Sequence, residues 1–202
     1  NALAGKAVAA GVLAPYSGPA ATATSASQLP APLVAVDHGY VTLNIDKAWF
    51  AQKGLALPTS LNDLTLPAYR KLLVVQNPAT SSPGQAFLWA TVAGLGEAAA
   101  FDWWARMRAN GVKVAKGWSQ AYYTDFTRNG GARPIVVSYA SSPAAEVFYS
   151  KTPLTAAPTQ SLALKGGVFR QVEAVALVKG GGQREAAGKF IEFMRSPAVQ
   201  EA

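Results

Sequence analysis

The sequence predicts an α/β protein with a mixed, mainly parallel sheet and flanking helices. Through the middle of the chain, short runs of β-branched residues alternate with segments whose apolar residues recur at helical spacing. Two of these runs, residues 72–75 and 135–137, each precede a Ser-Ser-Pro, at 81–83 and 141–143, where a helix is expected to begin. Alternation of strand and helix is typical of parallel strands joined by crossover helices. With 202 residues, half of them hydrophobic, the chain can bury a full core.

Before this alternating region the sequence predicts a helix, a loop and two short strands. Apolar residues at helical spacing predict a helix over residues 3–13, which stops before Pro15. Residues 16–32 are uncharged and rich in Ala, Ser, Thr, Pro and Gly, which is typical of a linker or surface loop. The two strands are expected at 33–36 and 41–45, interrupted by Asp37-His38-Gly39-Tyr40.

Within and after the alternating region, particular residues indicate where helices and strands begin or end. Ser60 followed by Asp63 is typical of a capping box at the start of a helix. Three consecutive glycines at 180–182 end a Val- and Ala-rich strand, and Ser196-Pro197 begins one more turn. The expected helices are 85–92, 98–110, 120–128, 143–149 and 184–195, and the expected strands are 112–114, 134–139 and 171–179.

Composition excludes several kinds of chemistry. The chain has no cysteine and only His38, so disulfides, thiolate metal sites, a cysteine nucleophile and multi-histidine zinc sites are excluded. Eighteen Lys and Arg against 11 Asp and Glu give a net charge of +7, but no basic run appears, which favours an ordinary solvated basic surface. No apolar stretch approaches the ~20 residues that span a bilayer, and the first residues do not form a signal peptide.

The two Ser-Ser-Pro segments and Lys116-Gly117-Trp118-Ser119 predict a binding cleft. Ligands in open α/β sheets bind beyond the carboxyl ends of strands, and free amides at helix N-termini hold anions and polar groups. Serine is also expected to cap each new helix. Trp118 has polar and small neighbours, so an exposed ring that stacks on a ligand ring or cation is as plausible as a buried one. Tyr139 ends a strand, where its hydroxyl can reach the cleft or pack at its rim.

Other sites remain open alternatives. Tyr122 and Tyr123 with Asp125 nearby fit a ferric ion, although Tyr122 shares a helical face with Phe126 and so fits a core position better. His38 beside Asp37 lacks a positioned nucleophile. No nucleophile elbow, phosphate-binding loop, paired catalytic carboxylates or dinucleotide fingerprint is present, so an enzyme, such as one that handles phosphate, is the minority interpretation.

From Asp37 onward the sequence resembles the thiamine-binding proteins of bacterial ABC importers, which are type II periplasmic solute-binding proteins. The Thr-Ser-x-Pro-Gly, Lys-Gly-Trp-Ser and Ser-Tyr-x-x-Ser-Pro-Ala segments are specific, and the rest is generic to the fold. The segments that carry the resemblance are 37–40, 77–84, 116–122, 138–144, 171–173 and 190–197.

The resemblance implies a two-lobed periplasmic receptor, without catalytic activity, cofactor or metal, that binds thiamine or thiamine phosphates between its lobes and delivers it to a membrane permease. It implies that Trp118 attracts the thiazolium ring and that Ser81, Ser82 and the amides near Gly84 hold the hydroxyethyl or phosphate tail. A ferric-ion receptor of the same fold, using Tyr122, Tyr123 and Tyr139, is the alternative. The expected ligand-binding residues are Asp37, Tyr40, Ser81, Ser82, Gly84, Trp118, Tyr139 and Ser142.

Two departures from the family pattern affect these expectations. Ala145 stands where the family has an aromatic residue that completes the ring stack. The family's opening stretch of the first lobe is also missing, so residues 1–42 and 168–202 are expected to be first-lobe remnants with the hinge, and residues 43–167 the second lobe. We therefore expect a fragment with weakened ligand affinity, rearranged or completed by another chain as a dimer or by exchange.

Overall fold

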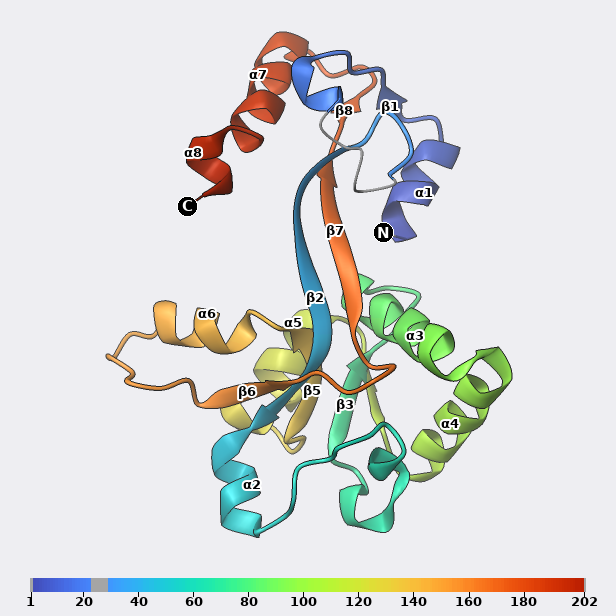
Figure 1. The fold of residues 1–202 in the computed structure, drawn as a ribbon, viewed down its shortest axis with the longest axis vertical. Helices are drawn as coiled ribbons and strands as arrows, with labels where there is room; N and C mark the ends of the chain where they lie inside the picture. Colours follow the sequence, from blue (N-terminus) through green and yellow to red (C-terminus); the bar gives the residue numbers. More distant parts are fainter. Residues whose placement is uncertain (1, 23–28, 202) are drawn as a thin grey trace. The chain divides into compact units, whose positions relative to one another are not determined.

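The computed structural model describes residues 2–22 and 29–201. Its contacts divide the chain into two compact units, unit 1 from Asn1–Gly39 and Gln171–Ala202 and unit 2 from Tyr40–Arg170. Two strands carry the chain from one unit to the other, β2 (Val34–Asp46) and β7 (Phe169–Val175), which pair with each other (Figure 1). No helix in the described part of the chain has the length and apolar character needed to cross a membrane.

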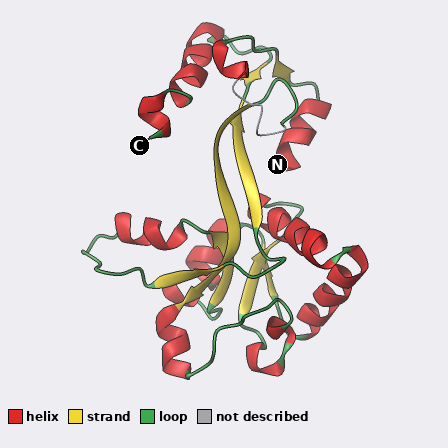
Figure 2. Cartoon of the chain, viewed as in Figure 1, coloured by secondary structure: helices red, strands yellow, loops and turns green. Residues whose placement is uncertain are grey.

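Unit 2 is built on a mixed sheet with the order β4-β3-β5-β2-β6 (Figure 2). Strand β3 pairs in parallel with both β4 and β5, whereas β2 pairs antiparallel with β5 and β6. These pairings with flanking helices confirm the predicted α/β class and mixed sheet, but the sheet is not mainly parallel, because β2 enters it antiparallel to both β5 and β6. The strands other than β2 are β3 (Leu73–Gln76), β4 (Lys113–Ala115), β5 (Ile135–Tyr139) and β6 (Thr159–Leu162).

The two faces of this sheet are covered differently. Helices α3 (Ser82–Leu95) and α4 (Glu97–Ala109) bury Phe87 and Trp103 against Leu73, Val75, Ile135 and Val137 on one face. The other face has a smaller cluster in which Val74 and Val136 pack against Tyr122 and Phe126. This second face is covered by α5 (Trp118–Gln120) and by a π-helical turn over Ala121–Asp125.

Shorter elements complete unit 2. Asp46 begins α2 (Lys47–Lys53) by accepting a hydrogen bond from the Trp49 amide at 3.2 Å. The capping box is confirmed, because the Ser60 amide donates to Asp63 at 3.1 Å and the Asp63 amide donates to Ser60 Oγ at 3.2 Å. The element it begins is a single 3-10 turn rather than an α-helix. The remaining helices are the 3-10 turns Asp63–Thr65, Pro67–Tyr69 and Thr127–Asn129, and α6 (Ser142–Phe148).

Unit 1 has its own small core. Strands β1 (Leu13–Ala14) and β8 (Leu177–Val178) pair antiparallel, and Ile191 of α7 packs with Ala14, Val34 and Leu177. The Tyr16 hydroxyl donates to Glu192, which also accepts from the Ala20 amide. The helices of this unit are α1 (Ala2–Ala9), a 3-10 turn over Pro19–Thr22, α7 (Arg184–Met194) and α8 (Pro197–Gln200).

Several predicted elements are corrected. The expected interruption at 37–40 is wrong, because β2 is one continuous strand whose Tyr40 carbonyl accepts from the Ala140 amide at 2.8 Å. The helix expected over 120–128 is divided between the π-helical and 3-10 turns, and the strand expected over 171–179 is divided into β7 and β8. The first helix ends at Ala9, and β6 was not predicted. Part of the expected loop over 16–32, residues 23–28, lies outside the described residues.

Candidate functional site

The carboxyl ends of three neighbouring strands meet at one edge of the unit 2 sheet. Because β3 is parallel to both β4 and β5, the segments that leave these strands emerge at the same edge. Two hydrogen bonds join the first two segments directly. The Asn77 amide donates to the Ala115 carbonyl at 2.8 Å, and Thr80 Oγ1 donates to the Lys116 carbonyl at 2.7 Å.

At this edge the chain leaves neighbouring strands toward opposite faces. Strand β3 continues into α3, which packs on the face that holds Phe87, whereas β4 continues into α5, which packs on the face that holds Tyr122. In open α/β sheets, such a divergence of neighbouring connections leaves a crevice, and ligands bind there. The predicted Ser-Ser-Pro and Lys-Gly-Trp-Ser segments therefore do converge on one edge.

Trp118 is half-buried, with one face of its ring covered. Its indole lies nearly parallel to the Tyr122 ring, with centroids 4.9 Å apart and planes 18° apart. Its Nε1 donates to Ser138 Oγ at 2.9 Å, and Ser138 Oγ lies 2.8 Å from Ser142 Oγ. Ser142 Oγ also accepts from the Tyr139 amide at 3.3 Å. The indole is thus fixed in orientation by a stack and a hydrogen-bonded pair of serines.

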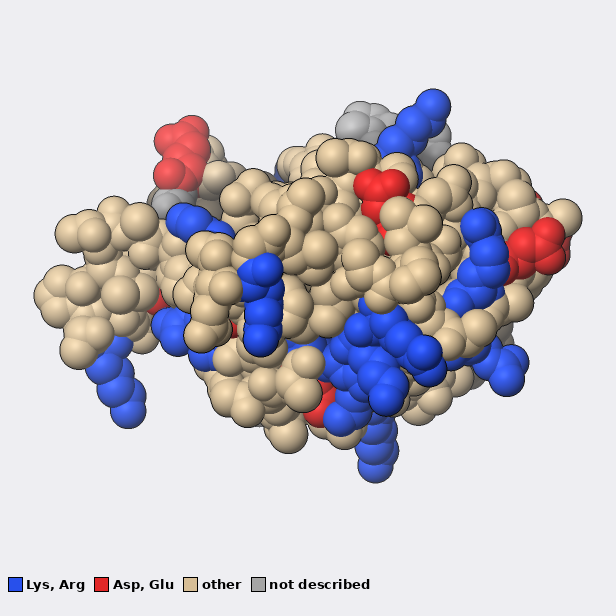
Figure 3. Space-filling view, turned by 90° about the horizontal axis from the view of Figure 1, so that it is seen from below, with Lys and Arg blue, Asp and Glu red and all other residues tan. Residues whose placement is uncertain are grey.

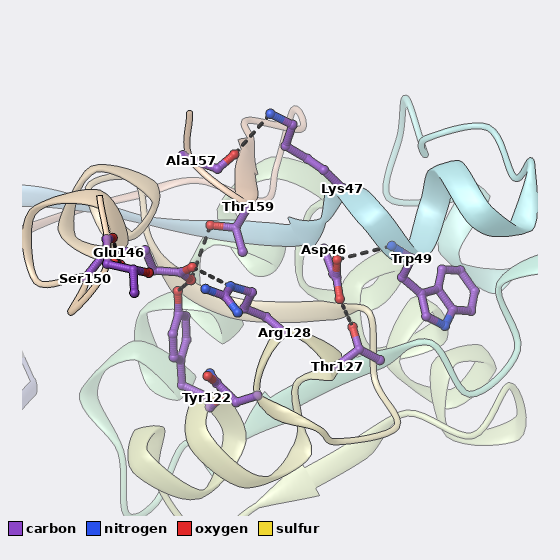
Figure 4. Close-up of polar contacts among 12 residues, drawn as sticks. Asp46, Lys47, Trp49, Tyr122, Thr127, Arg128, Glu146, Ser150, Ala157 and Thr159 are labelled. Atoms are coloured by element: carbon purple, nitrogen blue, oxygen red, sulfur yellow. Dashed lines mark hydrogen bonds and ion pairs between the residues drawn. The ribbon is translucent and has the colours of Figure 1, made fainter. Parts of the chain in front are cut away.

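Glu146 holds the hydroxyl of Tyr122 (Figure 4), whose ring stacks on Trp118. Glu146 of α6 accepts hydrogen bonds from the Tyr122 hydroxyl and from Thr159 Oγ1, the latter at 3.4 Å, and pairs with Arg128 Nε at 3.0 Å. Burial raises the pKa of Tyr122, and the hydrogen bond to Glu146 and the charge of that carboxylate raise it further. Tyr122 is therefore a neutral phenol at physiological pH, held by a carboxylate that Arg128 neutralises.

A cavity of about 490 Å³ opens beside these residues, within unit 2. Its size falls within the range of small-molecule sites. Aromatic rings form much of its wall, and Arg128, Glu146 and Lys151 supply charged groups. The lining residues are Trp118, Tyr122, Tyr123, Arg128, Asn129, Ser142, Ala145, Glu146, Tyr149, Ser150 and Lys151.

The start of α3 lies at the same edge but does not line this cavity. Ser81 is the N-cap residue of α3, yet its side chain makes no capping hydrogen bond, and neither does that of Ser141 at the start of α6. The expectation that serine side chains cap these helices is therefore wrong. At Gly84 a Cβ atom would lie 2.4 Å from the Gln76 carbonyl oxygen, so the contact between α3 and β3 requires glycine there. Ligand contacts of Ser81, Ser82 and Gly84 stay predictions.

Tyr139, Tyr40 and Asp37 are placed differently from Trp118. Tyr139 packs against the core on the α3 face, because alternate residues of β5 point to opposite faces of the sheet. The Tyr40 carbonyl bonds to the residue after Tyr139 and so brings Tyr40 to the end of β5. Asp37 belongs to unit 1. Ligand contacts of all three stay predictions.

Sequence reasoning missed Ser138, Glu146 and Tyr149. For Ser138 the available signal was a polar residue within an otherwise apolar strand, and its side chain is fully buried. For Glu146 the signal lay in its spacing of four residues from Ser142 along α6, which places both on one helical face. Ala145 lines the cavity, where a larger side chain would reduce its volume.

Comparison with known proteins places the chain in a family. The family of bacterial extracellular solute-binding proteins matches residues 1–202. The chain belongs to this family. A thiamine-binding periplasmic protein of Salmonella typhimurium is 34% identical over 169 residues, covering 84% of this chain and 48% of that protein. A solved periplasmic thiamin-binding protein superposes with a TM-score of 0.79 at 30% identity, covering 98% of this chain and 59% of that one.

The chain thus spans about half the length of the curated relatives it matches. Proteins that bind other ligands share this fold. Iron-bound HitA from Pseudomonas aeruginosa superposes with a TM-score of 0.70 at 18% identity, covering 97% of this chain and 62% of that one. Identity at that level shows the fold alone. Among the described residues, no group of three or more His, Asp or Glu side chains is placed to hold a metal ion.

Proposed function

We propose that this chain belongs to a receptor that binds thiamine or a thiamine phosphate and supplies it to the membrane permease of an ABC importer. The proposal includes an extracytoplasmic location and binding without chemical conversion. It rests on the match to periplasmic thiamine-binding relatives and on one geometric observation, the oriented ring of Trp118 beside a cavity at the carboxyl ends of the strands.

The chemistry of thiamine suits this ring. Its thiazolium ring is a delocalised cation, and cations are attracted to the face of an indole more strongly than to other side-chain rings. Tyr122 covers one face of Trp118 at 4.9 Å, so a ligand ring would stack on the other face or insert beside it. Ala145 leaves space in the cavity where the family pattern has an aromatic residue, and Tyr149, one helical turn further along, offers a second ring.

The tail of the ligand has a natural position at the start of α3. This helix has 14 residues, and its first amides lie beyond the end of β3, where they favour a hydroxyl or phosphate group. The Ser81 side chain makes no capping hydrogen bond, and Ser82 is the first residue of the helix, so we assign both hydroxyls to the ligand tail. The proposed tail contacts are therefore Ser81, Ser82 and the amide of Gly84.

A ferric-ion receptor is less well supported. Tyrosine binds ferric iron as a phenolate, whereas burial and Glu146 both raise the pKa of Tyr122 and favour its neutral form. Tyr123 is exposed, and Tyr139 packs on the other face of the sheet. The three tyrosines of the iron hypothesis therefore do not converge on one point within unit 2.

Calorimetric titration with thiamine, thiamine monophosphate, thiamine diphosphate and ferric ion tests the proposal. Trp118→Ala should weaken thiamine binding by about tenfold or more, because a desolvated cation–π contact contributes up to about 2 kcal/mol. Trp89→Ala is the matched control, since Trp89 lies on the exposed side of α3 and should leave affinity unchanged.

A second pair of variants separates the ring from the tail. Ser81→Ala with Ser82→Ala should weaken binding of the phosphates more than binding of thiamine itself. Unchanged thiamine affinity in Trp118→Ala, or tight ferric binding that gives a visible absorption band, would contradict the thiamine proposal.

A further inference from the structure

The net positive charge of the chain resides in one unit. Unit 2 contains thirteen of the 18 Lys and Arg residues and six of the 11 Asp and Glu residues, while unit 1 contains five of each. Unit 2 therefore carries a formal charge of +7, and unit 1 is neutral. The basic residues are separated along the sequence, which favoured an ordinary solvated basic surface, and the fold brings several of them together.

Six cations lie along the edge of the unit 2 sheet opposite the candidate site. This basic edge is formed where β3, β4 and β5 begin, so residues from separate segments become neighbours. Figure 3 views the molecule from this end and shows adjacent Lys and Arg side chains with few Asp or Glu beside them. The residues of the basic edge are Arg70, Lys71, Arg106, Arg108, Lys113 and Arg133.

Hydrogen bonds hold the backbone of the basic edge together. Arg133 Nη1 donates to the Lys71 carbonyl and, at 2.9 Å, to the Gly111 carbonyl. The Lys71 amide donates to the Asn110 carbonyl at 2.8 Å, and Gly111 lies so close that a Cβ there would be 2.7 Å from Lys71 Cγ. These contacts join the loop before β3 to the loop before β4, and so fix three segments of the edge relative to one another.

Few negative charges offset these cations. Asp125 is buried and pairs with Lys113, and the Asp63 carboxylate is occupied by the amides and hydroxyls of Thr59 and Ser60. Arg70, Lys71, Arg106 and Arg108 are exposed, and Arg106 Nη2 also donates to Asn62 Oδ1 at 3.2 Å. The edge therefore presents a row of positive charge that is largely uncompensated.

We propose that the basic edge docks unit 2 onto an anionic lipid surface. Such a surface presents an extended array of phosphates, which matches exposed cations from several elements. Each Lys or Arg near it strengthens binding about fivefold. Protein interfaces favour aromatic anchors at their centre, but the exposed residues of segments 62–71 and 106–114 include no aromatic side chain. Because the candidate site occupies the opposite edge of the sheet, a docked molecule leaves it accessible.

Sedimentation with vesicles tests this proposal. At low salt the chain should bind vesicles of phosphatidylcholine and phosphatidylglycerol in equal parts, bind pure phosphatidylcholine at least tenfold more weakly, and dissociate at high salt. The variant carrying Arg70→Gln, Lys71→Gln and Arg108→Gln should lose roughly a hundredfold in binding. Arg133 and Lys113 are left unchanged because their side chains bond to the fold.

A matched variant distinguishes the effect of the basic edge from the effect of net charge alone. Lys165→Gln, Arg170→Gln and Lys179→Gln remove the same charge from other exposed positions and should change binding less than about threefold. Equal losses in the two triple variants, equal binding to both vesicle types, or binding only to an acidic protein would each overturn the proposal. Thiamine titration of both variants is an independent readout, so failure of lipid docking leaves the ligand proposal untouched.

Discussion

The two faces of the unit 2 sheet differ in the chemistry of their inward side chains. On the α3 face, β2, β3 and β5 present only apolar or aromatic residues, and sixteen buried residues form one cluster. On the other face the alternate positions include Thr42, Asn44, Gln76 and Ser138, and only six buried residues cluster. On this face Gln76 and Ser138 stand near the carboxyl ends of β3 and β5, where the candidate site lies, and Thr42 of the antiparallel β2 is paired with Ser138.

The two faces of the sheet therefore contribute differently, one to stability and the other to the positioning of polar groups. The apolar face contributes most of the burial that stabilises unit 2, since burial scales with apolar area. On the polar face, buried groups hold one another in fixed positions: Asn44 Nδ2 donates to the Tyr139 carbonyl at 3.1 Å, and Gln76 Nε2 donates to the Val137 carbonyl at 2.7 Å. Stability and ligand binding should therefore respond to different substitutions.

The largest effect is expected from Phe87→Ala on the apolar face. Phe87 is fully buried and meets Trp103 and Trp104 edge to face, at 6.3 and 5.9 Å. Its removal should lower the free energy of unfolding by about 3–5 kcal/mol, measured by urea denaturation. Trp89→Ala, on the exposed side of the same helix, should cost less than about 1 kcal/mol. Similar losses in the two variants would show that burial on this face is not the main source of stability.

A smaller effect is expected where α3 meets the end of β3. Gly84→Ala places a Cβ against the Gln76 carbonyl oxygen, so the helix must shift, at a cost of about 1–3 kcal/mol. Gly117→Ala is the control, because Gly117 has extended backbone and open space around it. Thermal unfolding measures both. If Gly84→Ala is neutral, the close approach of α3 to β3 does not constrain this end of the sheet.

Tyr122→Phe tests the polar face. Loss of the hydroxyl that donates to Glu146 should cost about 1 kcal/mol at neutral pH. The pKa of Tyr122 is raised on folding, so this contribution is fully present below the unfolded pKa near 10.0 and is lost as pH rises through the folded value. Urea denaturation across the alkaline range should show the two proteins converging. A difference that stays constant with pH would exclude the bond to Glu146 as its source.

The sequence predicted the alternation of strands and helices better than it predicted the side chains of the candidate site. The alternation also predicted the sheet edge at which that site lies. Parallel strands must end at one edge, so Trp118 and the Ser-Ser-Pro segments could be brought together by topology alone. The roles of Ser138 and Glu146 depend on which face each side chain meets, and that is set by packing between distant segments. Ser142 shows the limit clearly: a serine before proline suggests a cap, yet its hydroxyl turns to Ser138 instead.

The smallest effect is expected from Asp63→Asn, which tests surface hydrogen bonds beside the apolar face. Asp63 accepts from the Thr59 amide at 2.7 Å and from Ser60, and these bonds lower its pKa from 3.8 to about 2. A lowered folded pKa means that the stabilisation is present above pH ~4 and is lost as pH falls toward the folded value. Wild type and Asp63→Asn should therefore differ slightly in melting temperature at pH 7 and converge near pH 2. Because Leu64 next to it is fully buried in the large cluster, a loss as large as that of Phe87→Ala would mean that this loop, rather than ring packing, holds the apolar face.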